Sequence, residues 1–305
     1  MKNRNIIKQD YKLVNAKYKL STSEIKFIMT AIAQIDTDDK DFQEYEIKVS
    51  ELEEKLQAEQ NETRLKQFAK RILSKPLEVP TNDGWAVFNW FSKIQYIRQE
   101  ARFLVRIDKD LKPYLLDLKK RFVKYNLRYI LPLTSSYSIR LYQLLKEYEK
   151  LNKRTFTVEE LQDLLQVPKS LKIYNRFKEK VLKVAEKELI EHCDIFFEFE
   201  EIKQGRKVKE ILFRIKPNKA NIQKEDDYLS SKKKFIAYIR AKYKPDLEKN
   251  HFPTILSTKE GNLKIDLSGK LYLSKKDTTE DYTPEQANKL WSWLYDLAKK
   301  KEYSF

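Results

Sequence analysis

The chain has 305 residues, 41% of them apolar, so it is long enough for two or three domains with packed cores. Its 62 Lys and Arg residues outnumber its 46 Asp and Glu residues, and the formal charge of +16 favours a polyanionic partner over the alternative of a merely soluble basic protein. One Cys and two His exclude a disulfide framework and an ordinary zinc site.

The N-terminal segment is polar and basic, and we expect residues 1–19 to form an arm. It has no apolar signal region, and no stretch of the chain approaches the roughly 20 apolar residues that cross a bilayer. We therefore expect a cytoplasmic protein without membrane contact. A capping box with Ser21 as N-cap and Glu24 three residues later predicts the start of the first helix.

The next segment alternates between helical and extended patterns. Alternation over 45–49 predicts a strand, and Leu52 and Leu56 mark a short helix. Apolar residues at helical spacing predict a helix over 64–73, which Pro76 ends. The remaining predicted elements are strands over 85–97 and 101–107 and a helix over 108–120.

The stretch from Phe156 to Pro217 carries the clearest pattern. A short helical segment is followed by a break at Val167–Lys169 and a longer helix whose apolar stripe runs from Ile173 to Leu189. Two β-rich runs then flank a polar turn at Lys203–Lys207, which predicts a hairpin with a cationic tip. Helix, turn, longer helix and basic hairpin is the order of a winged helix, whose long helix enters a DNA groove.

The chain also repeats itself. The apolar pattern from Val49 to Gln57 returns from Val158 to Gln166, displaced by 109 positions, and the strand near Phe103 returns near Ile211. Leu20–Ser23 likewise resembles Leu133–Ser136, which opens a helix over 135–150. We interpret the two copies as tandem winged-helix units. The expected organisation is an α+β fold with an arm, two winged-helix domains and a small α+β extension of unknown role, over residues 1–19, 20–130, 131–217 and 218–305.

Three stretches resemble the iteron-binding plasmid replication initiators. They are Leu133–Leu145, the opening from Val14 to Ile35, and Phe177–Leu189 followed by the hairpin with Gly205-Arg206-Lys207. The resemblance covers roughly residues 6–217. It implies two tandem winged helices that bind short direct repeats of duplex DNA at a plasmid origin, the second domain reading bases and the first holding the backbone or forming a dimer interface.

The same resemblance implies a monomer–dimer equilibrium, repression of the protein's own gene by dimers, origin opening, and recruitment of the host initiator and helicase. Two alternatives stay open. One is a transcriptional repressor with the same fold and no role in initiation. The other is a scaffold whose winged helices bind proteins.

Base readout is expected on the solvent side of the long helix near its N-terminal end, because Arg pairs with guanine and Asn with adenine through two hydrogen bonds. The alternative is an ordinary solvated helix face. The candidates are Lys169, Ser170, Lys172, Asn175, Arg176 and Lys178.

Phosphate contacts are expected on the second wing and on the equivalent helix and wing of the first copy, although exposed basic turns are common without any such role. The candidates are Lys203, Arg206, Lys207, Lys209, Arg64, Lys66, Gln67, Lys70, Arg71, Lys93 and Arg98. Four glycines leave no phosphate-binding Gly-rich loop, and no catalytic or metal cluster is evident. We therefore expect a DNA-binding protein that is not an enzyme and needs no cofactor or metal.

Overall fold

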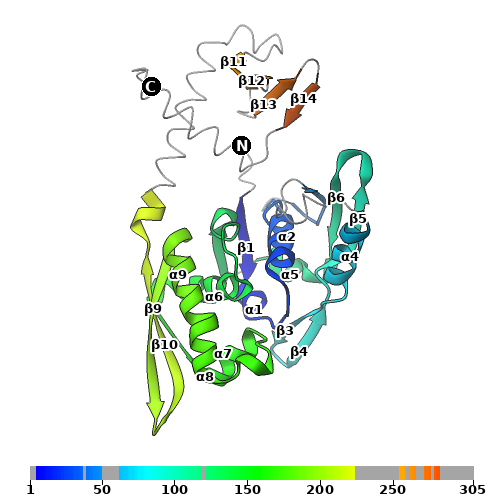
Figure 1. Ribbon diagram of the computed structural model, residues 1–305. Helices are drawn as coiled ribbons and strands as arrows, with labels where there is room; N and C mark the ends of the chain where they lie inside the picture. The colour runs from blue at the N-terminus through cyan, green and yellow to red at the C-terminus, as the bar shows by residue number, and fades with distance from the viewer. Residues whose placement is uncertain are drawn as a thin grey trace, which may run out of the picture. The chain divides into compact units, whose positions relative to one another are not determined.

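The computed structural model describes residues 5–36, 39–49, 62–118 and 121–223, together with four strands further along the chain (Figure 1). Lys2–Asn221 forms one compact unit, and Ile222–Phe305 belongs to another. The second unit contains a four-stranded antiparallel sheet in sequence order, made of β11 (Thr254–Thr258), β12 (Gly261–Ile265), β13 (Leu271–Lys275) and β14 (Thr278–Asp281). The predicted short helix at Leu52 and Leu56 lies outside the described residues.

The first winged-helix copy begins with α2 (Thr22–Ile32), and its predicted capping box is confirmed. The Ser21 side chain accepts the Glu24 N–H, and the Glu24 carboxylate accepts the Ser21 N–H at 2.7 Å. The other elements are β2 (Glu44–Lys48), α4 (Glu62–Leu73), β3 (Leu77–Thr81), β4 (Gly84–Phe88), β5 (Phe91–Ile97) and β6 (Arg102–Ile107). Strands β3 and β4 form a separate hairpin.

The second copy has the same plan. Its elements are α6 (Ser136–Lys146), β8 (Lys153–Thr157), α7 (Val158–Leu164), α8 (Tyr174–Phe177), a π-helical turn (Lys178–Leu182), α9 (Lys183–His192), β9 (Ile195–Gln204) and β10 (Lys207–Pro217). The predicted hairpin is confirmed as β9 and β10. The long helix begins at Tyr174, and the π turn, which the sequence did not indicate, interrupts it.

The two copies share their sheet topology, which confirms the internal repeat. The strand orders are β2-β6-β5 and β8-β10-β9. Ile47 lies opposite Phe103 in the first sheet, as Phe156 lies opposite Ile211 in the second. The helix caps differ slightly from the sequence alignment: the N-cap of α6 is Ser135 rather than Thr134, so the match to Ser21 is displaced by one residue.

Two expectations about the first copy are wrong. Residues 1–19 do not form an arm from Ile6 onward, because β1 (Ile6–Asp10) pairs antiparallel with β7 (Phe122–Asn126) and is followed by α1 (Tyr11–Val14). Nor is 108–120 one helix. The described part contains a 3₁₀ turn and the four-residue α5 (Lys112–Leu115), with Pro113 in the first turn of α5.

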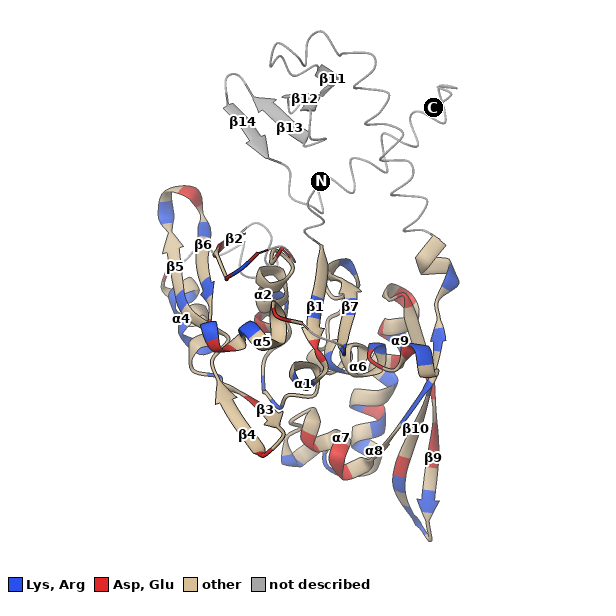
Figure 2. Ribbon diagram, turned by 180° about the vertical axis from the view of Figure 1, so that it is seen from behind, with Lys and Arg blue, Asp and Glu red and all other residues tan. Residues whose placement is uncertain are grey.

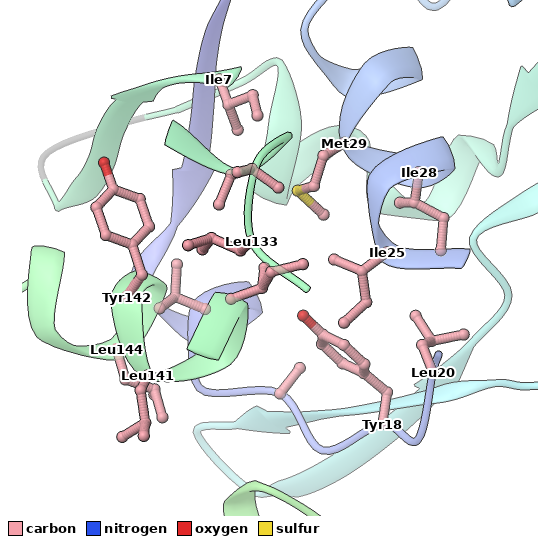
Figure 3. Close-up of a cluster of buried hydrophobic side chains, with 14 of the residues drawn as sticks. Ile7, Tyr18, Leu20, Ile25, Ile28, Met29, Leu133, Leu141, Tyr142 and Leu144 are labelled. Atoms are coloured by element: carbon pink, nitrogen blue, oxygen red, sulfur yellow. The ribbon is translucent and has the colours of Figure 1, made fainter. Parts of the chain in front are cut away.

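The N-terminal segment is buried between the two copies. Figure 3 shows side chains of β1, α2 and α6 around Leu133, among them Ile7, Met29 and Tyr142. These side chains are all at most 1% exposed, so the core is continuous through the segment that joins the copies. This burial explains why an N-terminal segment of polar composition is ordered.

A buried arginine fixes the same region. The Arg140 guanidinium of α6 donates to the carbonyl oxygens of Val14 and Ala16 at 3.0 and 2.8 Å, and to the Tyr18 hydroxyl at 2.8 Å. It also donates to Gln143 Oε1 at 3.0 Å. A buried charge needs hydrogen-bond partners, and these four bonds satisfy both terminal nitrogens of Arg140, although its buried Nε has no partner among the described residues. The network thereby holds the N-terminal segment against α6.

Candidate nucleic-acid interface

The predicted readout residues lie in the 3₁₀ turn Lys169–Leu171, at its end, and on the first turns of the helix that begins at Tyr174. The inward face of that helix is anchored by Phe177, Val181 and Leu182, which are fully buried. Five of the six candidates are exposed and, among the described residues, form no ion pair: Lys169, Ser170, Lys172, Asn175 and Arg176. The structure therefore exposes cationic, hydroxyl and amide side chains on two consecutive elements, the 3₁₀ turn and the first turn of α8.

The sixth candidate, Lys178, has a protein partner. Its Nζ lies 2.7 Å from Glu201 Oε1 on β9, and its side chain is 33% exposed. This contact raises the pKa of Lys178 and lowers that of Glu201. Burial and then the neighbouring Glu201 raise the pKa of Tyr174, which keeps its hydroxyl protonated. Lys178 and Glu201 thus join the helix to the wing, and the sequence did not single out Glu201.

The second wing separates its charges along its length. On the shaft, Arg214 pairs with Glu200 at 2.6 Å and Lys216 with Glu198 at 2.6 Å, so the strands are locally neutral. The turn is made by Gly205 at a φ of +63°, a conformation that favours glycine. Around it, the exposed residues that form no ion pair in the described chain are Lys203, Arg206 and Lys207.

The alternation of side chains along β9 determines the face of the strand on which Lys203 lies. Residues two apart on a strand share a face, so Lys203 lies on the same side of β9 as Glu201, which faces the long helix. Its proximity helps to lower the pKa of Glu201. Lys203 therefore borders the space between helix and wing. The fourth predicted wing residue, Lys209, lies 3.9 Å from Glu159 and is a weaker candidate.

The first copy differs in its charges. On α4, Lys66, Gln67 and Lys70 are exposed without an ion pair in the described residues, as expected for backbone contacts. Arg64 is also exposed, and Arg71 Nε lies 3.6 Å from Glu24 Oε1. The candidate wing residues are both paired: Lys93 Nζ lies 3.0 Å from Glu44, and Arg98 pairs with Glu62.

The two wings also point in different directions. Figures 1 and 2 show the β5–β6 hairpin and the β9–β10 hairpin at opposite ends of the compact unit. Lys and Arg mark the tip of the β9–β10 hairpin in Figure 2. Among the candidate cations in the described residues, those without an ion pair are Lys66 and Lys70 on α4 and, in the second copy, Lys169, Lys172, Arg176, Lys203, Arg206 and Lys207.

The described residues give no support for a metal site, a reactive cysteine or a membrane-spanning helix. Among the residues that the structure describes, no three His, Cys, Asp or Glu side chains gather as metal ligands would. Cys193 is buried, and its surroundings raise the pKa of the thiol, chiefly by burial. Within the described ranges, no helix has the length and apolar content that crossing a bilayer requires.

Comparison with protein families gives two matches, one to each copy. Residues 6–146 match the family described as Initiator Replication protein, WH1, and residues 157–215 match Initiator Rep protein, WH2. Together the two matches cover most of the compact unit.

Two individual proteins are similar over the same region. A replication initiation protein from Escherichia coli is 24% identical over 216 residues, which are 67% of this chain and 67% of that protein. The fold is similar to the crystal structure of Pi initiator protein in complex with iteron DNA, with a TM-score of 0.56 and 21% identity. That match covers 70% of this chain and 98% of the other. The predicted α+β fold with two winged helices is confirmed.

Proposed function

Since the chain belongs to the family of initiator replication proteins built from two winged-helix domains, we propose that it binds short direct repeats of duplex DNA at a plasmid origin and starts replication there. The binding would be sequence-specific and non-enzymatic, and it would take place in the cytoplasm. The crystal structure that resembles this chain is of an initiator in complex with iteron DNA, which agrees with this proposal.

One observation supports the proposal most. In the second copy, some Lys and Arg side chains form ion pairs with carboxylates, and others form none among the described residues. Along the wing shaft, the carboxylates Glu198 and Glu200 neutralise the cations, whereas Lys207 at the tip and Arg176 on the helix form no ion pair in the described chain. A polyanion supplies the missing counter-charge, and binding is favoured because each Lys or Arg that neutralises a DNA phosphate releases a cation condensed on the DNA into solution. We assign base readout to the helix and phosphate contact to the wing.

The first copy would mainly position the DNA. Lys66, Gln67 and Lys70 on α4 present donors suited to phosphate, whereas Lys93 and Arg98 are already paired with carboxylates. A duplex lying across both copies would meet one wing near each end of the contact. We further propose a monomer–dimer equilibrium in which dimers repress the protein's own gene, and recruitment of the host initiator and helicase.

The test is to select bound sequences from a random duplex pool and then place the recovered repeat in two reporters. A replication initiator should drive maintenance of a plasmid whose origin carries several copies of the repeat. A repressor without an initiation role should silence a promoter that overlaps the repeat and leave the plasmid unreplicated. Recovery of no common sequence would contradict both forms of specific binding.

A further inference from the structure

Ile173, immediately before the long helix, occupies an unfavourable position in two respects. Its side chain is 60% exposed, although isoleucine is among the residues most often buried. It is also the N-cap of α8 and makes no side-chain hydrogen bond there. Isoleucine is among the poorest N-cap residues, because it offers no oxygen to the free N–H groups of the first turn.

Three longer helices of the same unit begin with a hydroxyl side chain, and the apolar N-cap of the short α5, Leu111, is fully buried. The N-caps of α2, α6 and α7 are Ser21, Ser135 and Thr157, and each side chain accepts a backbone N–H of its helix. Positions where a fold departs from its own local rules are commonly functional or strained. The Ile173 backbone is unstrained, with φ −66° and ψ 122°, so strain does not account for an exposed apolar side chain at this position.

The exposed neighbours of Ile173 in the chain are polar, whereas Leu171 and Tyr174 are partly buried against the core. Lys172, Asn175 and Arg176 are exposed and form no ion pair among the described residues. A single apolar side chain within a group of cations and an amide is unlike the core of a protein–protein interface, from which charged residues are depleted. It matches the major groove of DNA, where hydrogen-bonding base edges surround one apolar feature, the C5-methyl group of thymine.

We propose that Ile173 contacts the C5-methyl group of a thymine in the bound repeat and thereby contributes to sequence readout. The inference rests on the proposed function, because it takes the turn before α8 as the part that enters the major groove. It adds an apolar contact to a site whose other candidates act through hydrogen bonds. No hydrogen bond to the base is needed from this residue, so replacing thymine with uracil removes the proposed contact and leaves the base pair unchanged.

The experiment uses the full chain and the highest-affinity duplex recovered from a random pool. Each thymine is replaced in turn by deoxyuridine, and affinity is measured at fixed salt for the wild type, Ile173→Ser and the control Ile190→Ser. Ile190 is also exposed, at 49%, but lies near the other end of the helical segment on α9. For the wild type and the Ile190→Ser control, replacing one particular thymine with deoxyuridine should weaken binding about fourfold, the equivalent of one buried methyl group. Ile173→Ser should bind that thymine duplex and its uracil form equally.

Thermal unfolding excludes misfolding as the cause. Because serine is a favourable N-cap, Ile173→Ser should unfold at the same or a higher temperature than the wild type. A wild type that is indifferent to every thymine replacement would overturn the proposal, as would a uracil penalty that persists in Ile173→Ser. If the pool yields no common sequence, the proposed function itself fails and this inference fails with it.

Discussion

Lys178 Nζ lies 2.7 Å from Glu201 Oε1, and this ion pair joins the predicted readout helix to the first strand of the wing. The pair is formed at the π turn, which begins at Lys178. Beyond Glu201 on the same face of the strand lies Lys203, a cation that forms no ion pair among the described residues. The ion pair therefore sets the position of the wing cations relative to the bases that the helix would read.

Exchanging the two charges tests this role. Lys178→Glu and Glu201→Lys should each lower the ratio of repeat to scrambled DNA affinity by roughly three- to tenfold, since each places like charges together. The double variant, which has the net charge of the wild type, should recover most of the ratio. If the double variant discriminates as poorly as Lys178→Glu alone, Lys178 contacts the DNA directly and our assignment is wrong.

Replacing Arg176 and replacing Lys207 should have different effects on DNA binding. Arg176→Ala should lower discrimination between repeat and scrambled DNA by about 1–3 kcal/mol, because a bidentate base contact would be lost. Lys207→Ala should weaken binding to all sequences and reduce the slope of log affinity against log salt by about 0.9. Binding titrations on both duplexes across a salt series measure the two effects. Identical behaviour of the two variants would contradict the division of labour between helix and wing.

Arg140 should be required for stability rather than for DNA contact. Arg140→Ala leaves the carbonyl oxygens of Val14 and Ala16 and the Tyr18 hydroxyl without a donor in a buried region, at a cost of about 3 kcal/mol or more in the free energy of unfolding. Urea unfolding measures the loss. The control Arg206→Ala, at the exposed wing tip, should change stability by less than about 0.5 kcal/mol. A loss of similar size in both variants would contradict the structural role of Arg140.

Glu24 predicts a specific acid dependence. Burial opposes its ionisation, but Lys75 Nζ at 2.7 Å and the Ser21 N–H of the capping box outweigh burial and hold the pKa of Glu24 below its usual value. The folded state therefore binds fewer protons than the unfolded state, whose pKa is about 4.3. The resulting stability is complete above that pH and is lost as the pH falls through the lower folded value.

Glu24→Gln removes this titration and leaves the other carboxylates in place. Measured by urea unfolding from pH 6 to pH 3, the wild type should lose more stability below about pH 4.3 than the variant does. The two curves should run parallel above pH 5. Parallel curves through the acid range as well would show that Glu24 is not held in its charged form by the fold.

Local patterns were enough to predict the elements that carry the candidate interface. The β9–β10 hairpin follows from two alternating runs around Gly205, and the shared sheet order follows from the internal repeat. The pairing of β1 with β7 could not be found this way, since Ile6 meets Asn126 across most of a domain and the five-residue strand has little pattern of its own. The structure shows that β1 is packed into the fold, so the expectation of an N-terminal arm was wrong from Ile6 onward.

The start of the long helix was the other point that spacing did not settle. Ile173 fits the apolar stripe in the sequence, so an inward position was expected. The helix begins one residue later, at Tyr174, and Ile173 is exposed. A one-residue difference in the helix start thus changes a predicted core residue into a surface residue. Ion pairs such as Lys178–Glu201 also depend on tertiary placement, which periodicity does not specify.

The central claim is that the helix at Tyr174 and the β9–β10 wing bind duplex DNA with sequence preference. Its most direct test is the affinity of the full chain for the selected repeat and for a scrambled duplex of the same length and composition, measured together at 0.15 M salt. We predict that the repeat binds at least about 10³-fold more tightly, as specific DNA-binding proteins do. Equal affinity for the two duplexes would contradict the account.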